Sequence, residues 1–291
     1  MARSGSTKNR KRASPSVQLV AGHVLRDVID QLRSLDRTLE SEASRLKPDQ
    51  RPVLMELAYG GCRQYFYLDG ILSQLLTKPI RRKDRMVHFL LIVGLYQLAF
   101  MRVPDHAAVD ETVKALEASK QSWARGLVNG VLRTYLRRRD DHTLTDLEQD
   151  IPDSAKVSFP PFLYSTIEEC WTEHAGTVYR ASIQKPPMTL RVNCQKTTPE
   201  DYLGLLGAKN IGAESMAECS TAINLEKPAP VEQIPMFADG WVSVQDLSAQ
   251  LCTDELFLAA DQRVLDACAA PGGKTCAILE TEPSVKLTAV D

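Results

Sequence analysis

The chain has 291 residues, of which 44% are hydrophobic and 25% charged, which excludes an intrinsically disordered protein and leaves room for two or three domains. The formal net charge of −2 hides an asymmetry, because residues 1–140 carry 25 Lys and Arg against 14 Asp and Glu, whereas residues 141–291 carry 10 against 23. A basic half joined to an acidic half predicts that the first half contacts a polyanion such as a nucleic acid.

The N-terminal residues 1–15 are polar and basic with no apolar segment behind them, so we expect a flexible basic tail and not a signal peptide. The most apolar segment, Met86–Val103, contains polar side chains and is shorter than the roughly 20 residues that span a bilayer. Seven scattered cysteines without a Cys-x-x-Cys pair indicate reduced thiols and predict no zinc site. We therefore expect a cytoplasmic monomer with no membrane segment and no metal.

From residue 16 to residue 140, apolar side chains recur at three- and four-residue spacing, which predicts a helical domain. The predicted helical stretches are 17–35, 53–76, 86–100, 107–116 and 123–136. Short connections between such helices favour a compact bundle. Gly130 falls inside the last stretch, and because a mid-helix glycine usually has a packing reason, we expect a close helix–helix contact there.

Residues 141–161 are acidic and end in a Pro-Pro pair, so we expect a linker. Residues 162–261 predict a small α+β region. Its predicted elements are helical Phe162–Ala181, strand-like Met188–Asn193, helical Thr198–Gly207, strand-like Val242–Val244 and helical Gln245–Leu258.

The most informative motif of the chain is VLDACAAPGGKT at Val264–Thr275, within residues 262–291. A short apolar run ends at Asp266, a loop containing Gly272 and Gly273 follows, and the next residues predict a helix. Glycines at a strand-to-helix turn let the backbone approach a ligand closely, and the helix N-terminus offers N–H groups to an anion.

A second apolar run, VKLTAVD, ends at Asp291, which lies 18 residues after Gly273. An acidic residue roughly 20 residues beyond such a turn can accept hydrogen bonds from both ribose hydroxyls of a nucleotide cofactor. The two runs and the turn therefore predict the first β-α-β unit of a nucleotide-cofactor fold.

A P-loop is the competing interpretation, because Gly273-Lys274-Thr275 matches the end of its motif. The first glycine of that motif would stand at position 268, where this chain has Cys268. Pro271 also removes an N–H group from a loop that needs such groups to hold phosphate. The nucleotide-cofactor interpretation is favoured over the P-loop and over a plain turn.

Several stretches resemble the bacterial small-subunit (16S) ribosomal RNA cytosine-C5 methyltransferase B family. Asp266–Lys274 (DACAAPGGK) resembles the S-adenosylmethionine loop of the RNA cytosine-C5 methyltransferases, and Pro186–Asn193 (PPMTLRVN) and Asp239–Gln250 (DGWVSVQDLSAQ) resemble the stretches before it. The matches to the NusB-like extension of the family are Val87–Leu98 (VHFLLIVGLYQL), His106–Val113 (HAAVDETV) and Gly126–Arg133 (GLVNGVLR). The motifs occur in the family's order and cover nearly the whole chain after residue 15.

This resemblance implies an all-α NusB-like N-terminal bundle, a small α+β connector and the first β-α-β of an α/β Rossmann-like methyltransferase domain. Residues 16–140 would contact ribosomal RNA, and S-adenosylmethionine would be the cofactor. Asp291 would hold the ribose of that cofactor. The residues that would line its methionine part are Cys268, Ala269, Ala270, Pro271, Gly272, Gly273 and Lys274.

In the family's reaction a cysteine thiolate adds to C6 of cytosine, which activates C5 to accept the methyl group before the C5 proton is removed. The family places that cysteine in strands beyond the cofactor loop. We therefore expect no catalytic residue in this chain, and we expect a truncated protein with little or no activity alone. The alternatives are a non-catalytic RNA-binding NusB-like module and a P-loop nucleotide-binding protein.

Overall fold

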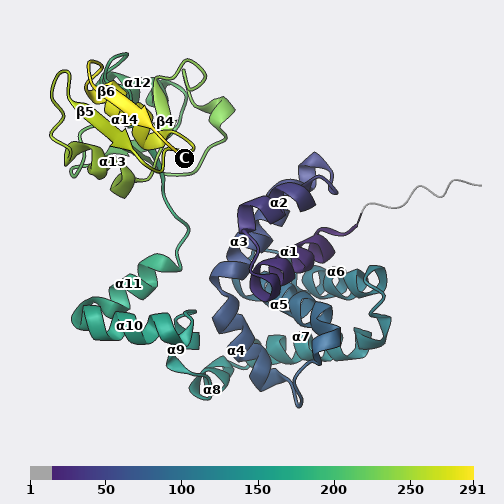
Figure 1. Ribbon diagram of the computed structural model, residues 1–291. Coiled ribbons are helices and arrows are strands. Elements are labelled where there is room, and N and C mark those ends of the chain that lie inside the picture. The colour runs from purple at the N-terminus through teal and green to yellow at the C-terminus, as the bar shows by residue number, and fades with distance from the viewer. Residues whose placement is uncertain (1–14) are drawn as a thin grey trace, which may run out of the picture. The chain divides into compact units, whose positions relative to one another are not determined.

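The computed structural model describes residues 15–291, and its contacts group the chain into two compact units that divide between Gln184 and Lys185 (Figure 1). The predicted basic tail lies outside the described residues apart from Pro15. The α-helices of the first unit are α1 (Val17–Gln31), α2 (Leu35–Ala43), α3 (Arg51–Arg63), α4 (Tyr65–Leu75), α5 (Arg85–Phe100), α6 (Asp105–Ala118), α7 (Arg125–Asp140), α8 (Leu144–Gln149), α9 (Asp153–Lys156), α10 (Pro161–Trp171) and α11 (Ala175–Ser182).

Helix α5 is the centre of the first unit, where it packs against α1, α3, α4, α6 and α7 (Figure 1). Every residue from Val87 to Leu98 is buried, because these helices surround α5 on all sides. Burying a large aliphatic side chain contributes about 1.5–3 kcal/mol to folding, so α5 is a major source of stability. Within residues 15–291 no helix is both long and apolar enough to cross a membrane.

The predicted helical domain is confirmed, with two differences in its first half. The stretch 17–35 ends early, because Leu32 adopts a left-handed backbone conformation with φ of 53°. The stretch 53–76 is two helices, α3 and α4, that meet at Gln64. The later stretches correspond to α5, α6 and α7.

The prediction of a close helix–helix contact at Gly130 is wrong. A methyl group added at Gly130 would meet no atom within 4 Å, and the same holds for Gly126 one turn earlier on α7. Both glycines are exposed. Packing within the unit therefore does not require glycine at either position.

The expected linker at residues 141–161 is instead part of the helical unit. Helices α8 and α9 pack against α4, and Leu147, Ile151 and Ala155 are buried in the main core. At Gly70 of α4, an added methyl group would lie 3.3 Å from Ile151 Cδ1. Leu147 lies in α8, Ala155 in α9 and Ile151 between the two helices, so no single helical stretch reveals these three apolar residues within the acidic composition. Helices α10 and α11 follow in the same unit around a smaller core that contains Phe159 and Tyr179.

Burial lowers the pKa of His88, on α5, to about 4, and the nearby Arg85 guanidinium acts in the same direction. The side chain is 7% exposed, and its Nε2 lies 3.3 Å from Asp69 Oδ1. Since the folded pKa is below the usual 6.5, the unfolded chain binds a proton first as the pH falls. The contribution of His88 to the unfolding free energy is therefore fully present above pH 6.5. This contribution decreases as the pH falls from 6.5 towards 4.

We expect the unfolding free energy of the wild type relative to a His88→Asn variant to fall by about 3 kcal/mol between pH 7 and pH 4. Urea unfolding followed by circular dichroism at each pH measures this difference and cancels titrations common to both proteins. His142→Asn is the matched control, because His142 is exposed and asparagine tolerates its positive φ of 56°. A pH-independent difference between wild type and His88→Asn would contradict the prediction.

The second unit contains two sheets. The first sheet is antiparallel, with strand order β2-β3-β1-β4. Its strands are β1 (Met188–Val192), β2 (Ala213–Ser215), β3 (Ala222–Leu225) and β4 (Val242–Val244). Helix α12 (Pro199–Ala208) buries Tyr202 and Leu206 in one core with residues of this sheet. Strands β1 and β4 and helix α12 match predicted elements. The short strands β2 and β3 were not predicted.

Strands β5 (Arg263–Asp266) and β6 (Lys286–Ala289) form a parallel pair joined by α14 (Gly273–Thr281), and α13 (Leu247–Asp254) packs against α14. Both sheets belong to one compact unit, residues 185–291. The expected division at residue 262 is therefore not seen in the contacts.

Candidate functional site

The predicted cofactor loop connects the end of β5 to the start of α14. Gly272 lies at the N-cap of α14 with φ of +100° and ψ of 6°, a conformation that residues with a Cβ rarely adopt. Its carbonyl accepts the first helical hydrogen bond, from the Cys276 N–H at 2.9 Å. A methyl group on Gly272 would meet no atom within 4 Å, so this side of the turn is open to a ligand.

The carboxylate of Asp266 fixes both ends of the loop. Its Oδ2 accepts a hydrogen bond from the Thr275 hydroxyl at 2.6 Å, and its Oδ1 accepts one from the Cys268 N–H at 3.4 Å. The sequence analysis predicts no bond between Asp266 and Thr275, although both lie in the predicted loop motif.

Asp291 follows β6 and lies beside the loop, although 18 residues separate it from Gly273. Its Oδ1 accepts a hydrogen bond from the Ala270 N–H at 3.2 Å, and the Ala269 N–H donates to the Val290 carbonyl at 3.1 Å. The parallel pairing of β5 with β6 brings the carboxyl ends of both strands to the same edge, where ligands bind in open α/β sheets.

The other predicted loop residues are assembled in the same turn, and most of them reach solvent. Cys268, Ala270, Pro271 and Lys274 are exposed, and Ala269 and Gly273 are partly buried. The first N–H groups of a helix have no partner within the helix, so the start of α14 offers donors to an anion. The site therefore combines anion-binding N–H groups, open space at Gly272 and a carboxylate at Asp291.

Two cysteines elsewhere in the chain have environments opposite to that of a reactive thiol. Burial raises the pKa of the Cys62 thiol to about 11, and burial also raises that of Cys194. A nucleophilic cysteine needs a lowered pKa, so neither side chain is activated. Among residues 15–291, no group of three or more His, Cys, Asp or Glu side chains is arranged to hold a metal ion.

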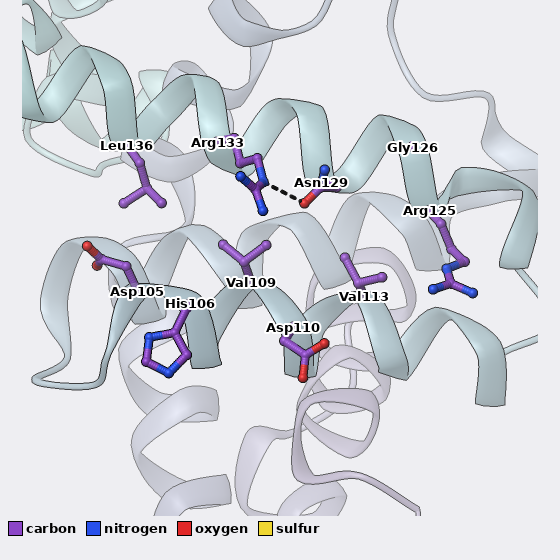
Figure 2. A pocket seen from close by; sticks show the side chains of 10 residues that line it. All are labelled: Asp105, His106, Val109, Asp110, Val113, Arg125, Gly126, Asn129, Arg133 and Leu136. Carbon is purple, nitrogen blue, oxygen red and sulfur yellow. Dashed lines mark hydrogen bonds between the residues drawn. The ribbon is translucent and has the colours of Figure 1, made fainter.

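A second candidate site is a groove of about 590 Å³ between α6 and α7 in the helical unit. Figure 2 shows Val109 and Val113 of α6 facing α7, with Arg133 hydrogen-bonded to Asn129. That bond runs from Arg133 Nε to Asn129 Oδ1 at 3.0 Å. At one end of the groove Asp105 accepts two hydrogen bonds from Arg139, at 2.7 and 3.0 Å, and this pairing lowers the pKa of Asp105.

Two protein-family models match this chain. The NusB family model matches residues 15–137, and the model of the RsmF/B-like methyltransferase ferredoxin-like domain matches residues 159–232. The first covers α1 to α6 and most of α7. The second covers α10 and α11 together with β1, α12, β2 and β3, and ends before the cofactor loop.

Curated relatives extend this similarity through the loop. The chain is 41% identical over 276 residues to ribosomal RNA small subunit methyltransferase B of Vibrio cholerae and 40% identical over 276 residues to that of Serratia proteamaculans. Each match covers 95% of this chain and 63% of the relative, so the chain spans less than two thirds of their length. The crystal structure of PH0851 is similar in fold, with a TM-score of 0.64 at 14% identity, covering 97% of this chain and 65% of that one.

Proposed function

We propose that this chain serves S-adenosylmethionine-dependent methylation of C5 of a cytidine in small-subunit ribosomal RNA. Its residues 15–137 match the NusB family model, and its residues 159–232 match the model of the RsmF/B-like methyltransferase ferredoxin-like domain. The observation that carries the proposal is the loop at Gly272, which lies beside the Asp291 carboxylate. The sequence similarity of the chain to ribosomal RNA small subunit methyltransferase B supports the proposed substrate class. The proposed place of action is the cytoplasm.

The proposed cofactor contacts follow from the chemistry of the loop. The residues from Cys268 to Lys274 would line the methionine part. The N–H groups of Gly273 and Lys274, at the start of α14, would hold its carboxylate, which suits a helix N-terminus. The Asp291 carboxylate would accept hydrogen bonds from the ribose hydroxyls. When bound, S-adenosylmethionine supplies an electrophilic methyl group on its sulfonium, and the chain holds that group at a fixed place. We assign no catalytic residue within residues 15–291.

The binding of S-adenosylmethionine in preference to ATP tests this proposal against the P-loop alternative. We expect equilibrium dialysis with radiolabelled ligands to detect saturable binding of S-adenosylmethionine, unaffected by ATP in excess. Replacing Lys274 with alanine should weaken this binding only slightly, because the proposed contacts are backbone N–H groups and the Lys274 side chain is exposed. ATP binding that is lost in Lys274→Ala would favour a P-loop protein instead.

The basic residues of the helical unit favour RNA as its partner. The most basic helix end of this unit is the C-terminal half of α7. Arg139 is paired with Asp105, and Arg138 lies 3.7 Å from Asp146. Arg133 and Arg137 donate to the neutral side chains of Asn129 and Thr134, which leaves their charge available to phosphates. Both are exposed on the same side of α7 as Gly126 and Gly130.

We expect an Arg133→Gln/Arg137→Gln double variant to bind small-subunit ribosomal RNA more weakly, with a log–log salt slope smaller by about 0.7 per lost phosphate contact. Filter binding across a series of salt concentrations measures both quantities. Arg33→Gln/Arg45→Gln is a control with the same charge change, because these arginines are paired with Asp27 and Glu42. Equal effects of the two double variants would indicate a general charge effect and contradict the proposed surface.

A further inference from the structure

Arg191 of β1 is the most buried arginine of the second unit, with 4% of its surface exposed. Its Nε and Nη2 donate to the two carboxylate oxygens of Glu280 on α14, each at 2.9 Å. This two-point geometry is specific to a guanidinium and is stronger than a single hydrogen bond. The pair joins the antiparallel sheet to the helix that follows the cofactor loop.

The same guanidinium also reaches the glycine turn. Its Nη1 donates to the carbonyl oxygen of Gly273 at 2.7 Å and to Oε1 of Gln245. Gly273 is the first residue of α14, immediately after the open N-cap at Gly272. One buried side chain therefore bonds to three positions, Gln245, Gly273 and Glu280, that are 54, 82 and 89 residues from it in the sequence.

Gln245 is itself held in place and lies against the turn. Its backbone N–H donates to the Thr189 carbonyl at 3.0 Å, and its carbonyl accepts from the Gln250 side chain at 2.9 Å. Its Nε2 would lie 3.6 Å from a methyl group added at Gly273. The stretches PPMTLRVN and DGWVSVQDLSAQ, which contain Arg191 and Gln245, thus meet at the cofactor turn.

Within its own β5-α14-β6 segment the loop is held by Asp266 and Asp291, and Arg191 adds a restraint from the antiparallel sheet. Most loop residues from 267 to 271 are exposed, and no atom lies within 4 Å of a methyl group placed on Gly272. A binding site built on a loop needs support from rigid elements to keep its donors in place. β1 is a central strand of the antiparallel sheet, between β3 and β4, and so provides such an element.

We propose that Arg191, held by Glu280 and Gln245, is a positioning residue that fixes the conformation of the Gly272–Gly273 turn and thereby sets its affinity for S-adenosylmethionine. This inference rests on the proposed function for the identity of the ligand. The role of Arg191 in fixing the turn is independent of the ligand. Lysine cannot replace arginine in it, because an ammonium group cannot make the parallel bonds to Glu280 and also reach Gly273 and Gln245.

The test uses Arg191→Lys, which keeps the positive charge beside Glu280, and Glu280→Gln, which keeps one acceptor oxygen, so that one variant suffices if the other does not fold. The matched control is Lys286→Met, which removes the exposed Lys286–Asp261 pair of the same unit. For each protein, calorimetry measures S-adenosylmethionine affinity. Hydrogen exchange measured without ligand follows the amide of Cys276, which bonds to Gly272, and the amide of Ile223 in β3.

We expect Arg191→Lys and Glu280→Gln to bind S-adenosylmethionine roughly tenfold more weakly, the lower end of the loss observed when the hydrogen-bond partners of metal ligands are replaced. Exchange at Cys276 should become faster while exchange at Ile223 and all properties of Lys286→Met stay unchanged. Equal acceleration at Cys276 and Ile223 would show a purely structural role and overturn the proposal, as would unchanged affinity and exchange. If the wild type does not bind S-adenosylmethionine, the proposed function fails, whereas the exchange data still decide whether Arg191 fixes the turn.

Discussion

A Gly60→Ala variant is expected to lose about 3 kcal/mol of unfolding free energy, at the upper end of the usual cost of overpacking a core. Gly60 lies on α3, and a methyl group there would be 1.9 Å from the hydroxyl oxygen of Tyr96 and 2.0 Å from its Cζ. Such distances are far inside van der Waals contact. Either the tyrosine ring or helix α3 must move to accommodate alanine.

The ring has little freedom to move. Tyr96 is 4% exposed, it stacks with Phe100 at a centroid distance of 5.4 Å, and its hydroxyl donates to Glu56 Oε1 at 2.8 Å. Moving α3 instead would separate it from α1 and α5, against which it packs. Both responses cost core contacts.

Urea unfolding of the wild type, Gly60→Ala and Gly130→Ala checks this prediction. Gly130→Ala is the matched control, because its methyl group meets no atom and alanine favours helix by up to about 1 kcal/mol over glycine. We therefore expect the two substitutions to have opposite signs. A Gly60→Ala protein as stable as the wild type would refute the close approach of α3 to Tyr96.

The second large effect is expected at Asp291, where replacement by alanine should weaken S-adenosylmethionine binding roughly 30-fold or more, corresponding to about 2 kcal/mol. Two contributions are lost together in the proposed site. The ribose hydroxyls lose a charged acceptor, and the Ala270 N–H loses the Asp291 Oδ1 that accepts its hydrogen bond at 3.2 Å. Asp291→Asn retains one carbonyl oxygen and should fall between the wild type and Asp291→Ala.

Isothermal titration calorimetry of the three proteins measures this series. The control is Glu232→Ala, which removes an exposed carboxylate from the same unit and should leave the affinity unchanged. Equal affinities for the wild type and Asp291→Ala would remove Asp291 from the cofactor site. Equal losses in Asp291→Ala and Glu232→Ala would indicate that only the net charge of the unit matters.

The elements that could be predicted from the sequence are those whose signal is local. Helix α5 is apolar along its whole length, and the glycine turn before α14 has a distinctive composition. By contrast, residues 141–161 are acidic and bury only three apolar residues in the main core, one in α8, one in α9 and one between them, so their composition predicts a linker. Strands β2 and β3, of three and four residues, are too short for a clear alternation of polar and apolar side chains.

The support of the candidate site is the part that a single sequence could not provide. Arg191 and Glu280 are 89 residues apart, and neither position indicates the other. Arg191 lies in strand β1 and Glu280 in helix α14, and nothing in the sequence of either element indicates a bond between them. Only the packing of α14 near β1 shows that an arginine in the first sheet is bonded to the turn of the second.

The most direct measurement of the proposed function is the 5-methylcytidine content of small-subunit ribosomal RNA from cells that contain or lack the gene for this protein. Nucleoside mass spectrometry gives the amount, and bisulfite sequencing gives the position. Our account predicts that one cytidine of the small-subunit RNA loses its C5 methyl group when the gene is removed and regains it when the gene is restored. An unchanged 5-methylcytidine pattern in the absence of the gene would contradict it.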